Sequence, residues 1–250
     1  MIYVCSDIHG CSERFYTLLK EINFNDSDTM YILGDIIDRN DGGLELLKYV
    51  MKKDNIHLLM GNHEEFMYSY LVRLNVLGKL DEKVNLPHDI WLSDNNGGRI
   101  TLNDFVKEPI DNKIEILKYL SELPLIVLLE VNGSKFHLSH AGTISNVLAK
   151  DIWYVSDVSN TERSIITWFC PYRDGEFISH DRYPKDYISI IGHVPVERLN
   201  ENYKYTILKD NNIINIDSGC AMYKLERDNK FFETALSCLC LDTMNVIYVR

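Results

Sequence analysis

The stretch over residues 30–64 has the pattern strand, acidic turn, helix, strand, polar turn, and it limits the possible folds of this chain most strongly. The apolar run 30–33 ends at Gly-Asp-Ile-Ile-Asp-Arg, residues 34–39, and the apolar run 56–60 ends at Gly-Asn-His-Glu, residues 61–64. Parallel strands joined by a helix end at the same edge of a sheet, which is where open α/β sheets bind ligands. The sequence therefore predicts a ligand site built from these two turns.

A third polar turn is expected at the same edge, because the apolar run 2–5 ends at Ser-Asp-Ile-His-Gly, residues 6–10. Carboxylate, imidazole and amide groups together suit hard or borderline divalent metal ions, and no thiolate pattern accompanies them. The sequence therefore predicts a metal site. The side chains that should meet there are Asp7, His9, Asp35, Asp38, Arg39, Asn62 and His63.

Length and charge narrow the function. A chain of 250 residues suits one large α/β domain, and without a linker or repeat we expect a single domain over residues 1–250. The formal net charge of −11 argues against a general nucleic-acid partner, which requires a basic surface. A metal pocket would still attract phosphate, so small or protein-borne phosphates remain possible substrates.

Cellular location is also suggested by the sequence. The six cysteines form no CxxC pair, which favours reduced thiols over a zinc-thiolate site. The first apolar run begins at Ile2, so we expect no signal peptide, and no apolar run has the length of about 20 residues that spans a bilayer. These features predict a cytoplasmic protein without a membrane partner.

Strands and helices alternate in the N-terminal half, whereas short strands dominate the C-terminal half. This order predicts an α/β fold of two mixed β-sheets packed face to face and flanked by helices. Residues 78–112 break the alternation with Pro87, the run 95–98 and Pro109. We expect a cap-like insertion there, either a functional cap or binding loop or a helical segment packed on the surface.

Two later apolar runs end at histidines: His140-Ala141-Gly142 follows residues 136–139, and Gly192-His193 follows residues 187–191. The five clusters, in order, resemble the signature of PPP-type metallophosphoesterases of the calcineurin-like superfamily, which runs GDxHG, GDxxDR, GNHE, H-A/G-G and GH. The resemblance extends from residue 3 to about residue 220. It is strongest to small bacterial and phage serine/threonine phosphatases, which share further segments at residues 96–98, 101–102, 192–195 and 215–219.

The resemblance implies two divalent metal ions, with Asp7, His9 and Asp35 on one and Asn62, His140 and His193 completing the other beside a bridging Asp35. A hydroxide between the ions would attack phosphorus directly. His63 would protonate the leaving group with Asp38 fixing its ring, and Arg39 would bind phosphate. The family's second phosphate-binding arginine is expected at Arg173, with Arg163 and Arg182 as weaker candidates. Mn²⁺ is the expected metal, with Fe, Zn²⁺, Ni²⁺ and Co²⁺ as alternatives.

Several neighbouring residues receive other interpretations. Glu64 is expected to act as a supporting or helix-terminal carboxylate, and Asp217 as either a turn former or a supporting group. The first motif has Ser6 where the family has glycine, and Asn40 follows Arg39 where the family commonly has glycine; asparagine tolerates a left-handed backbone there. The remaining histidines are expected to be structural or exposed, namely His57, His88, His137 and His180.

Four functions are consistent with these residues. The first is dephosphorylation of phosphoserine or phosphothreonine in proteins, with phosphotyrosine as a further candidate substrate. The second is hydrolysis of a dinucleoside polyphosphate by a symmetrical hydrolase, although those enzymes commonly carry alanine in place of Asp38. A nuclease or phosphodiesterase is disfavoured by the net charge. A catalytically inactive metal-binding scaffold would lack a ligand or the acid, and neither is missing here.

Overall fold

The structure, a computed structural model, describes residues 1–74, 90–173, 176–177, 180–199, 205–222, 226–227, 230–231 and 233–250. Residues 78–89 of the expected insertion, His88 included, lie outside the described residues, as do the side chains of Arg173 and His180. Within the described ranges, no helix combines the length and the apolar character needed to cross a membrane.

The first sheet has the strand order β15-β14-β1-β2-β3 in the described part of the chain. Strands β1, β2 and β3 are parallel, as the spacing of the first three motifs predicts, and β14 pairs antiparallel with both β1 and β15. The bounds are β1 Ile2–Cys5, β2 Thr29–Ile32, β3 Ile56–Leu58, β14 Leu236–Cys240 and β15 Val246–Val249.

The second sheet has the order β10-β11-β9-β5-β4-β6 among the described residues, and it is also mixed. The hairpin between β4 and β5 turns at Asn132 and Gly133, both of which have positive φ as a tight two-residue turn requires. The bounds are β4 Pro124–Val131, β5 Ser134–Ser139, β6 Ile152–Tyr154, β9 Ile188–Ile191, β10 Leu208–Asp210 and β11 Ile213–Asn215.

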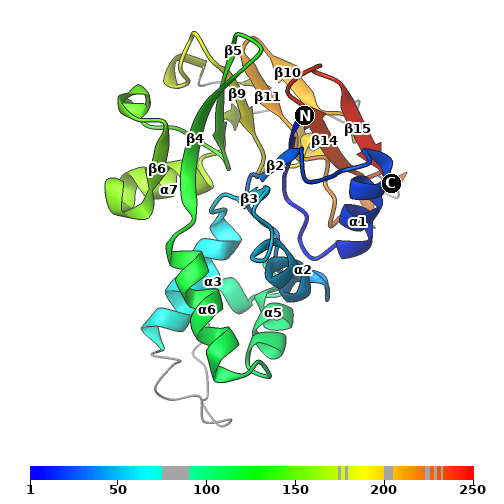
Figure 1. The fold of residues 1–250 in the computed structure, drawn as a ribbon, viewed down its shortest axis with the longest axis vertical. Helices are drawn as coiled ribbons and strands as arrows, with labels where there is room; N and C mark the ends of the chain where they lie inside the picture. The colour runs from blue at the N-terminus through cyan, green and yellow to red at the C-terminus, as the bar shows by residue number, and fades with distance from the viewer. Residues whose placement is uncertain are drawn as a thin grey trace.

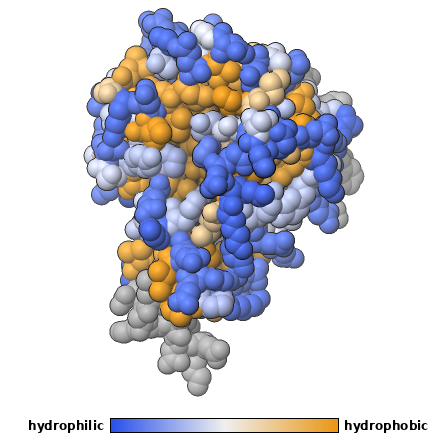
Figure 2. Space-filling view, viewed as in Figure 1, coloured by the Kyte–Doolittle hydropathy of each residue, from blue (hydrophilic) through white to orange (hydrophobic). Residues whose placement is uncertain are grey.

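The two sheets pack face to face, and side chains alternate between two hydrophobic cores. Val4 of β1 packs between the sheets with residues such as Phe136 and Ile190, whereas its neighbours Tyr3 and Cys5 face the helices. The predicted sandwich is therefore confirmed. On the outer face seen in Figure 2, hydrophobic residues gather over the upper half of the molecule, which contains the sheets.

Helices flank the sandwich and form the lower half of the molecule in Figure 1. Helix α7 begins with a capping box in which the Ser159 hydroxyl accepts from the backbone N–H of Glu162. The α-helices are α1 Ser12–Glu21, α2 Gly43–Val50, α3 Asn62–Arg73, α5 Gly98–Phe105, α6 Ile110–Ser121, α7 Asn160–Trp168 and α8 Val196–Leu199. The 3-10 helices are η1 Ile90–Leu92, η2 Val147–Ala149, η3 Val155–Asp157 and η4 His180–Arg182.

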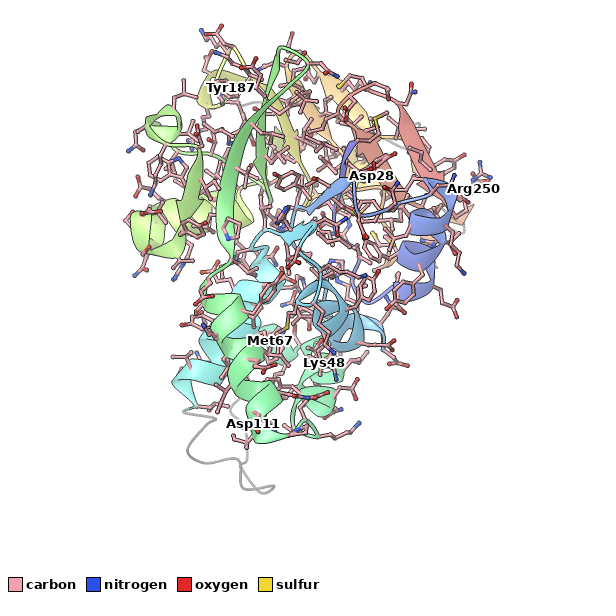
Figure 3. All side chains as sticks on the ribbon, viewed as in Figure 1. Asp28, Lys48, Met67, Asp111, Tyr187 and Arg250 are labelled. Carbon is pink, nitrogen blue, oxygen red and sulfur yellow. The ribbon has the colours of Figure 1, made fainter. Side chains whose placement is uncertain are left out.

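The described part of the expected insertion is helical and packs against α2 and α3, whereas its sequence lacks regular periodicity. Lys48 of α2 forms an ion pair with Glu108, and Met67 of α3 is fully buried in this helical half (Figure 3). Residues 90–112 therefore include a helical segment packed on the molecule, and a cap-like role for the insertion stays a prediction.

Two short hairpins complete the described elements, β7 Tyr172–Arg173 with β8 Glu176–Phe177 and β12 Glu226–Arg227 with β13 Lys230–Phe231.

Candidate metal centre

The turns that follow β1 and β2 adopt an uncommon backbone conformation. Asp7, His9, Asp35, Asp38 and Arg39 all have φ between 48° and 72°, although non-glycine residues rarely occupy this region. Backbone hydrogen bonds join the turns, because the amide of His9 donates to the Asp35 carbonyl at 2.9 Å. Such strained residues gather where surrounding structure holds them in place, often at functional sites.

Glu64 holds the second and third turns together. Its carboxylate is fully buried and accepts from the backbone N–H groups of Asp35 at 2.7 Å, Ile36 at 3.0 Å and Gly61 at 3.0 Å. Burial raises the pKa of the Glu64 carboxyl above its usual value, although the backbone donors of Asp35 and Ile36 act in the opposite direction. Glu64 therefore supports the site by holding the backbone of two turns. It lies in neither of the groups of potential ligands described next.

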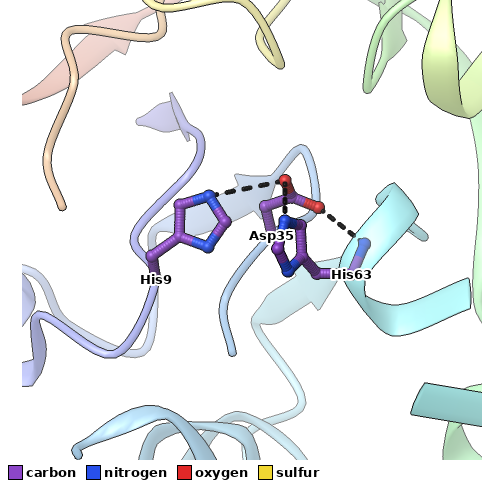
Figure 4. A group of neighbouring side chains, drawn as sticks. All are labelled: His9, Asp35 and His63. Atoms are coloured by element: carbon purple, nitrogen blue, oxygen red, sulfur yellow. Dashed lines mark hydrogen bonds and ion pairs between the residues drawn. The ribbon is translucent and has the colours of Figure 1, made fainter. Parts of the chain in front are cut away.

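The two carboxylate oxygens of Asp35 face different histidines. Asp35 Oδ2 lies 3.5 Å from His9 Nε2 and 3.8 Å from His63 Nε2, and Figure 4 shows the three side chains converging. Asp35 Oδ1 lies 3.5 Å from His140 Nε2. The same carboxylate therefore belongs to two groups of potential metal ligands, one with His9 and His63 and one with His140 and His193.

Asn62 completes the second group. Asn62 Oδ1 lies 2.9 Å from His140 Nε2, and His193 Nδ1 lies 3.2 Å from the same nitrogen. The opposite nitrogen of His140, Nδ1, is 2.8 Å from the carbonyl of Leu33 and must carry the proton. His9 is oriented in the same way, with Nδ1 donating to the carbonyl of Ile37 at 3.0 Å. Both Nε2 atoms therefore present lone pairs to the site, as metal-binding histidines do.

Burial governs the protonation of these groups. It lowers the pKa of His9 well below its usual value, with Arg39 and His63 adding to the effect, and it lowers the pKa of His193 in the same direction. Burial also raises the pKa of Asp35 well above its ordinary range. Neutral imidazole is the form that binds metal, so the histidines are suited to that role, and a nearby cation would favour the ionised carboxylate.

His63 is part of a second buried arrangement. Its Nδ1 donates to Asp38 Oδ2 at 2.7 Å, which leaves Nε2 directed toward the site. Asp38 is fully buried and also accepts from Trp91 Nε1 at 2.7 Å and Thr101 Oγ1 at 2.5 Å. Although burial lowers the pKa of His63, the carboxylates of Asp35 and Asp38 raise it above its usual value. The pair therefore favours a protonated imidazole.

A pocket of about 860 Å³ opens above these groups. Arg39 Nη2 lies 3.3 Å from His63 Nε2 at the pocket wall. A second cationic side chain, Arg198 of α8, lines the same pocket, and so does the partly exposed indole of Trp168. The remaining lining residues are Asp35, Asn40, Asn62, His63, Asn95, Asn96, His193, Val194, Pro195, Ala221 and Met222.

Some expected site residues have other surroundings. Asp7 Oδ2 accepts from the His193 backbone N–H at 3.0 Å and from the Ser6 hydroxyl, and Asp7 is in neither ligand group within the described chain. Arg163 pairs with Glu65 at 2.8 Å, and the guanidinium of Arg182 lies 4.8 Å from the ring of Phe169. Neither Arg163 nor Arg182 lines the pocket.

Asn40 does not adopt the left-handed backbone that asparagine tolerates, because the left-handed residues of this turn are Asp38 and Arg39. The Asn40 side chain instead donates to the His9 carbonyl at 2.8 Å and thereby joins two turns. Asp217 is a turn former, since its Oδ1 accepts from the Gly219 N–H at 2.9 Å. His137 is fully buried, and burial lowers its pKa to about 3, in keeping with a structural position.

Sequence reasoning missed the support for Asp38 and the composition of the pocket wall. Trp91 and Thr101 reach Asp38 across 53 and 63 residues of chain. The Asn-Gly-Gly run at residues 96–98 was a hint in the sequence, because glycine occurs where another group approaches the backbone closely. In the structure a Cβ on Gly98 would lie 2.4 Å from Trp91 Nε1. Arg198 stands only five residues after His193, but no spacing rule singles it out.

Comparison with known proteins agrees with this geometry. The calcineurin-like phosphoesterase family model matches residues 1–217. A symmetrical bis(5'-nucleosyl)-tetraphosphatase of Salmonella paratyphi C is 28% identical over 142 residues, which are 56% of this chain and 42% of that protein. The one from Buchnera aphidicola subsp. Acyrthosiphon pisum is 44% identical over 64 residues, 25% of this chain and 23% of the relative. The matches thus span less than half the length of these relatives.

A solved structure shares the fold across nearly the whole chain. It is of a protein provisionally described as a diadenosine tetraphosphatase, with a TM-score of 0.60, 16% identity, and coverage of 99% of this chain and 92% of the other. At that identity the likeness concerns the fold alone. The family model, by contrast, matches most of the chain, and its match includes every residue of the two ligand groups. This chain belongs to the calcineurin-like phosphoesterase family.

Proposed function

We propose that this chain hydrolyses phosphate esters or phosphoanhydrides with the help of divalent metal ions. The observation that carries the proposal is the Asp35 carboxylate, whose two oxygens face two separate groups of histidines at the base of a pocket. One carboxylate shared by two ligand groups suits a site for two ions. Membership of the family, which implies divalent metal ions, supports the same proposal.

The donor chemistry fits the metal ions. His9 and His140 each direct an unprotonated Nε2 into the site, and Asn62 supplies an amide oxygen. Asp7, His9 and Asp35 are assigned to one ion, and Asp35, Asn62, His140 and His193 to the other. Bound ions would supply a water molecule activated for attack and would neutralise phosphate charge. Imidazole and carboxylate together suit Mn²⁺ as well as Fe, Zn²⁺, Ni²⁺ and Co²⁺.

His63 is assigned the transfer of a proton to the leaving oxygen. Its Nε2 lines the pocket, while Asp38 holds Nδ1–H and stabilises the protonated ring. Arg39 is assigned the role of binding the phosphate oxygens, because its guanidinium lies beside His63 and can donate two parallel hydrogen bonds. Arg173 remains a prediction for the second arginine, since its side chain lies outside the described residues.

The favoured substrate is a dinucleoside polyphosphate. The curated relatives carry the name symmetrical bis(5'-nucleosyl)-tetraphosphatase, which supports the nucleotide over a phosphoprotein. A pocket of about 860 Å³ has the size of small-molecule sites, and it contains two arginines besides its asparagines. A phosphoserine or phosphothreonine protein is the second candidate. The buried Asp38–His63 pair favours it, because an alkoxide leaving group requires a proton.

One comparison tests the function and orders the substrates. The purified chain with Mn²⁺ is assayed on diadenosine tetraphosphate and on a phosphothreonine peptide, with chromatography of the nucleotide products. We expect two molecules of ADP per tetraphosphate and a higher kcat/KM for the nucleotide. A higher kcat/KM for the peptide would make the protein phosphatase the better assignment. If a chain shown to bind Mn²⁺ hydrolyses neither substrate, the hydrolase proposal is contradicted. The catalytically inactive metal-binding scaffold would then be the better assignment.

A further inference from the structure

Trp168 is an exposed aromatic residue at the wall of the pocket. It ends α7 and is 37% exposed, whereas the other two tryptophans of the chain, Trp91 and Trp153, are 0% and 5% exposed. Hydrolysis of a bare phosphate group requires no indole beside the site. A large apolar surface left open next to ionic groups indicates a ligand that has a flat apolar part as well as a charged part.

The indole is held in a defined position relative to the metal ligands. Its ring is 4.8 Å from that of Phe66 at an interplanar angle of 66°, and 5.7 Å from that of His193 at 80°. Both contacts are edge-to-face, so the neighbouring rings fix the direction of the indole without stacking upon it. A phosphate placed beside His193 therefore has an aromatic surface next to it, within the same pocket.

Arg198 gives this wall a positive charge. It is an exposed residue of α8, and it lines the pocket together with Trp168 and His193. Arg39 serves the phosphate beside His63. A second guanidinium at the same pocket matches a ligand that carries further phosphate groups.

We propose that Trp168 stacks on the nucleobase of a dinucleoside polyphosphate and that Arg198 binds a phosphate adjoining the one that is attacked. The inference rests on the proposed hydrolase function and names the residues that select its substrate. Stacking on an aromatic side chain tolerates any base and contributes on the order of tenfold or more in affinity. The Trp168 wall therefore selects for the presence of a base and not for its identity.

Fluorescence tests the stacking apart from turnover. Adenosine monophosphate and ribose 5-phosphate, which has no base, are titrated separately into the Mn²⁺-loaded protein. We expect the mononucleotide alone to quench tryptophan emission, because a stacked base contacts only Trp168, and we expect Trp168→Leu to lose the quenching. Equal quenching by ribose 5-phosphate, or quenching that persists in Trp168→Leu, would overturn the assignment.

Kinetics test selection. In Trp168→Leu we expect KM for diadenosine tetraphosphate to rise about tenfold more than KM for ribose 5-phosphate, which has no flat ring, with recovery in Trp168→Phe. Tyr154→Leu, a similarly exposed aromatic that lies outside this pocket, is the matched control. Arg198→Met should weaken the binding of diadenosine tetraphosphate more than the binding of adenosine monophosphate, because the mononucleotide lacks the adjoining phosphate.

The outcomes separate the inference from the function. Without Mn²⁺-dependent hydrolysis of any of these substrates by the wild-type chain, the proposed function itself fails. If ribose 5-phosphate is hydrolysed and Trp168→Leu affects both substrates equally, the stacking proposal fails while the hydrolase stands. A selective loss on a phosphothreonine peptide would instead assign Trp168 to peptide binding and overturn the proposal.

Discussion

Asp38 Oδ2 lies 2.7 Å from both His63 Nδ1 and Trp91 Nε1, so one buried carboxylate oxygen joins the pocket histidine to the helical segment that follows α3. The other oxygen accepts from Thr101 in the same segment. The helical half of the molecule therefore fixes the orientation of His63. The wider consequence is that residues 90–105 support the chemistry of the site, whatever further role residues 75–89 have.

Replacing His63 by asparagine removes the proposed proton donor. We expect kcat for a phosphothreonine peptide or diadenosine tetraphosphate to fall by roughly 10²–10⁴. The loss should be smaller for p-nitrophenyl phosphate, whose leaving group departs without a proton. Steady-state kinetics on both kinds of substrate, together with calorimetric Mn²⁺ binding, measure this. An equal loss on both substrates would show that His63 acts mainly through the metal ions.

Adding a methyl group at Gly98 should disturb the support of Asp38. Its Cβ would lie 2.4 Å from Trp91 Nε1, so the indole must move. We expect Gly98→Ala to lower the free energy of unfolding by about 1–3 kcal/mol in urea denaturation. Trp91→Phe makes room, so in a double-mutant cycle the Gly98 substitution should cost less in that background. Equal costs in both backgrounds would contradict the packing account.

Glu64→Gln should loosen the turns that carry Asp35 and Asn62. A glutamine cannot accept from all three backbone N–H groups that Glu64 binds, so at least one buried donor loses its partner. We expect a loss of about 1–3 kcal/mol in unfolding free energy and weaker Mn²⁺ binding. Glu45→Gln, at an exposed position on α2, is the matched control. Unchanged Mn²⁺ affinity in Glu64→Gln would rule out its support of the ligands.

Glu197 should make stability depend on pH. Its carboxylate oxygens are buried without a hydrogen-bond partner, and burial raises its pKa to about 7 from 4.5. Because the folded state disfavours the ionised form, the wild-type chain loses stability as pH rises from 4.5 through 7. In the metal-free protein, the free energy of unfolding of Glu197→Gln should rise relative to that of the wild type by up to about 3 kcal/mol across that range.

Urea denaturation at pH 5 and pH 8 measures this gain, with the exposed Glu122→Gln as a control for the loss of one negative charge. A constant difference between wild type and Glu197→Gln at the two pH values would contradict the prediction.

The sequence predicted those parts of the site that follow from strand order. Residues such as Asp7 and Asp35 follow apolar runs, and the shared edge of the parallel strands β1 and β2 collects them without detailed packing. The contact of Trp91 with Asp38 was not predictable, because it depends on how a helical segment packs across 53 residues of chain. Local propensity likewise does not reveal that Asp38 and Arg39, and not Asn40, adopt the left-handed conformation, since tertiary hydrogen bonds impose it.

Asp35 belongs to both groups of potential metal ligands and would hold an ion with each of them. Calorimetric titration of the metal-free chain with Mn²⁺, side by side with Asp35→Asn, tests it most directly, with turnover measured on the same samples. We expect two ions per wild-type chain, and in Asp35→Asn the loss of at least one ion together with metal-dependent turnover. A single ion in the wild-type chain, or full turnover in Asp35→Asn, would contradict the account.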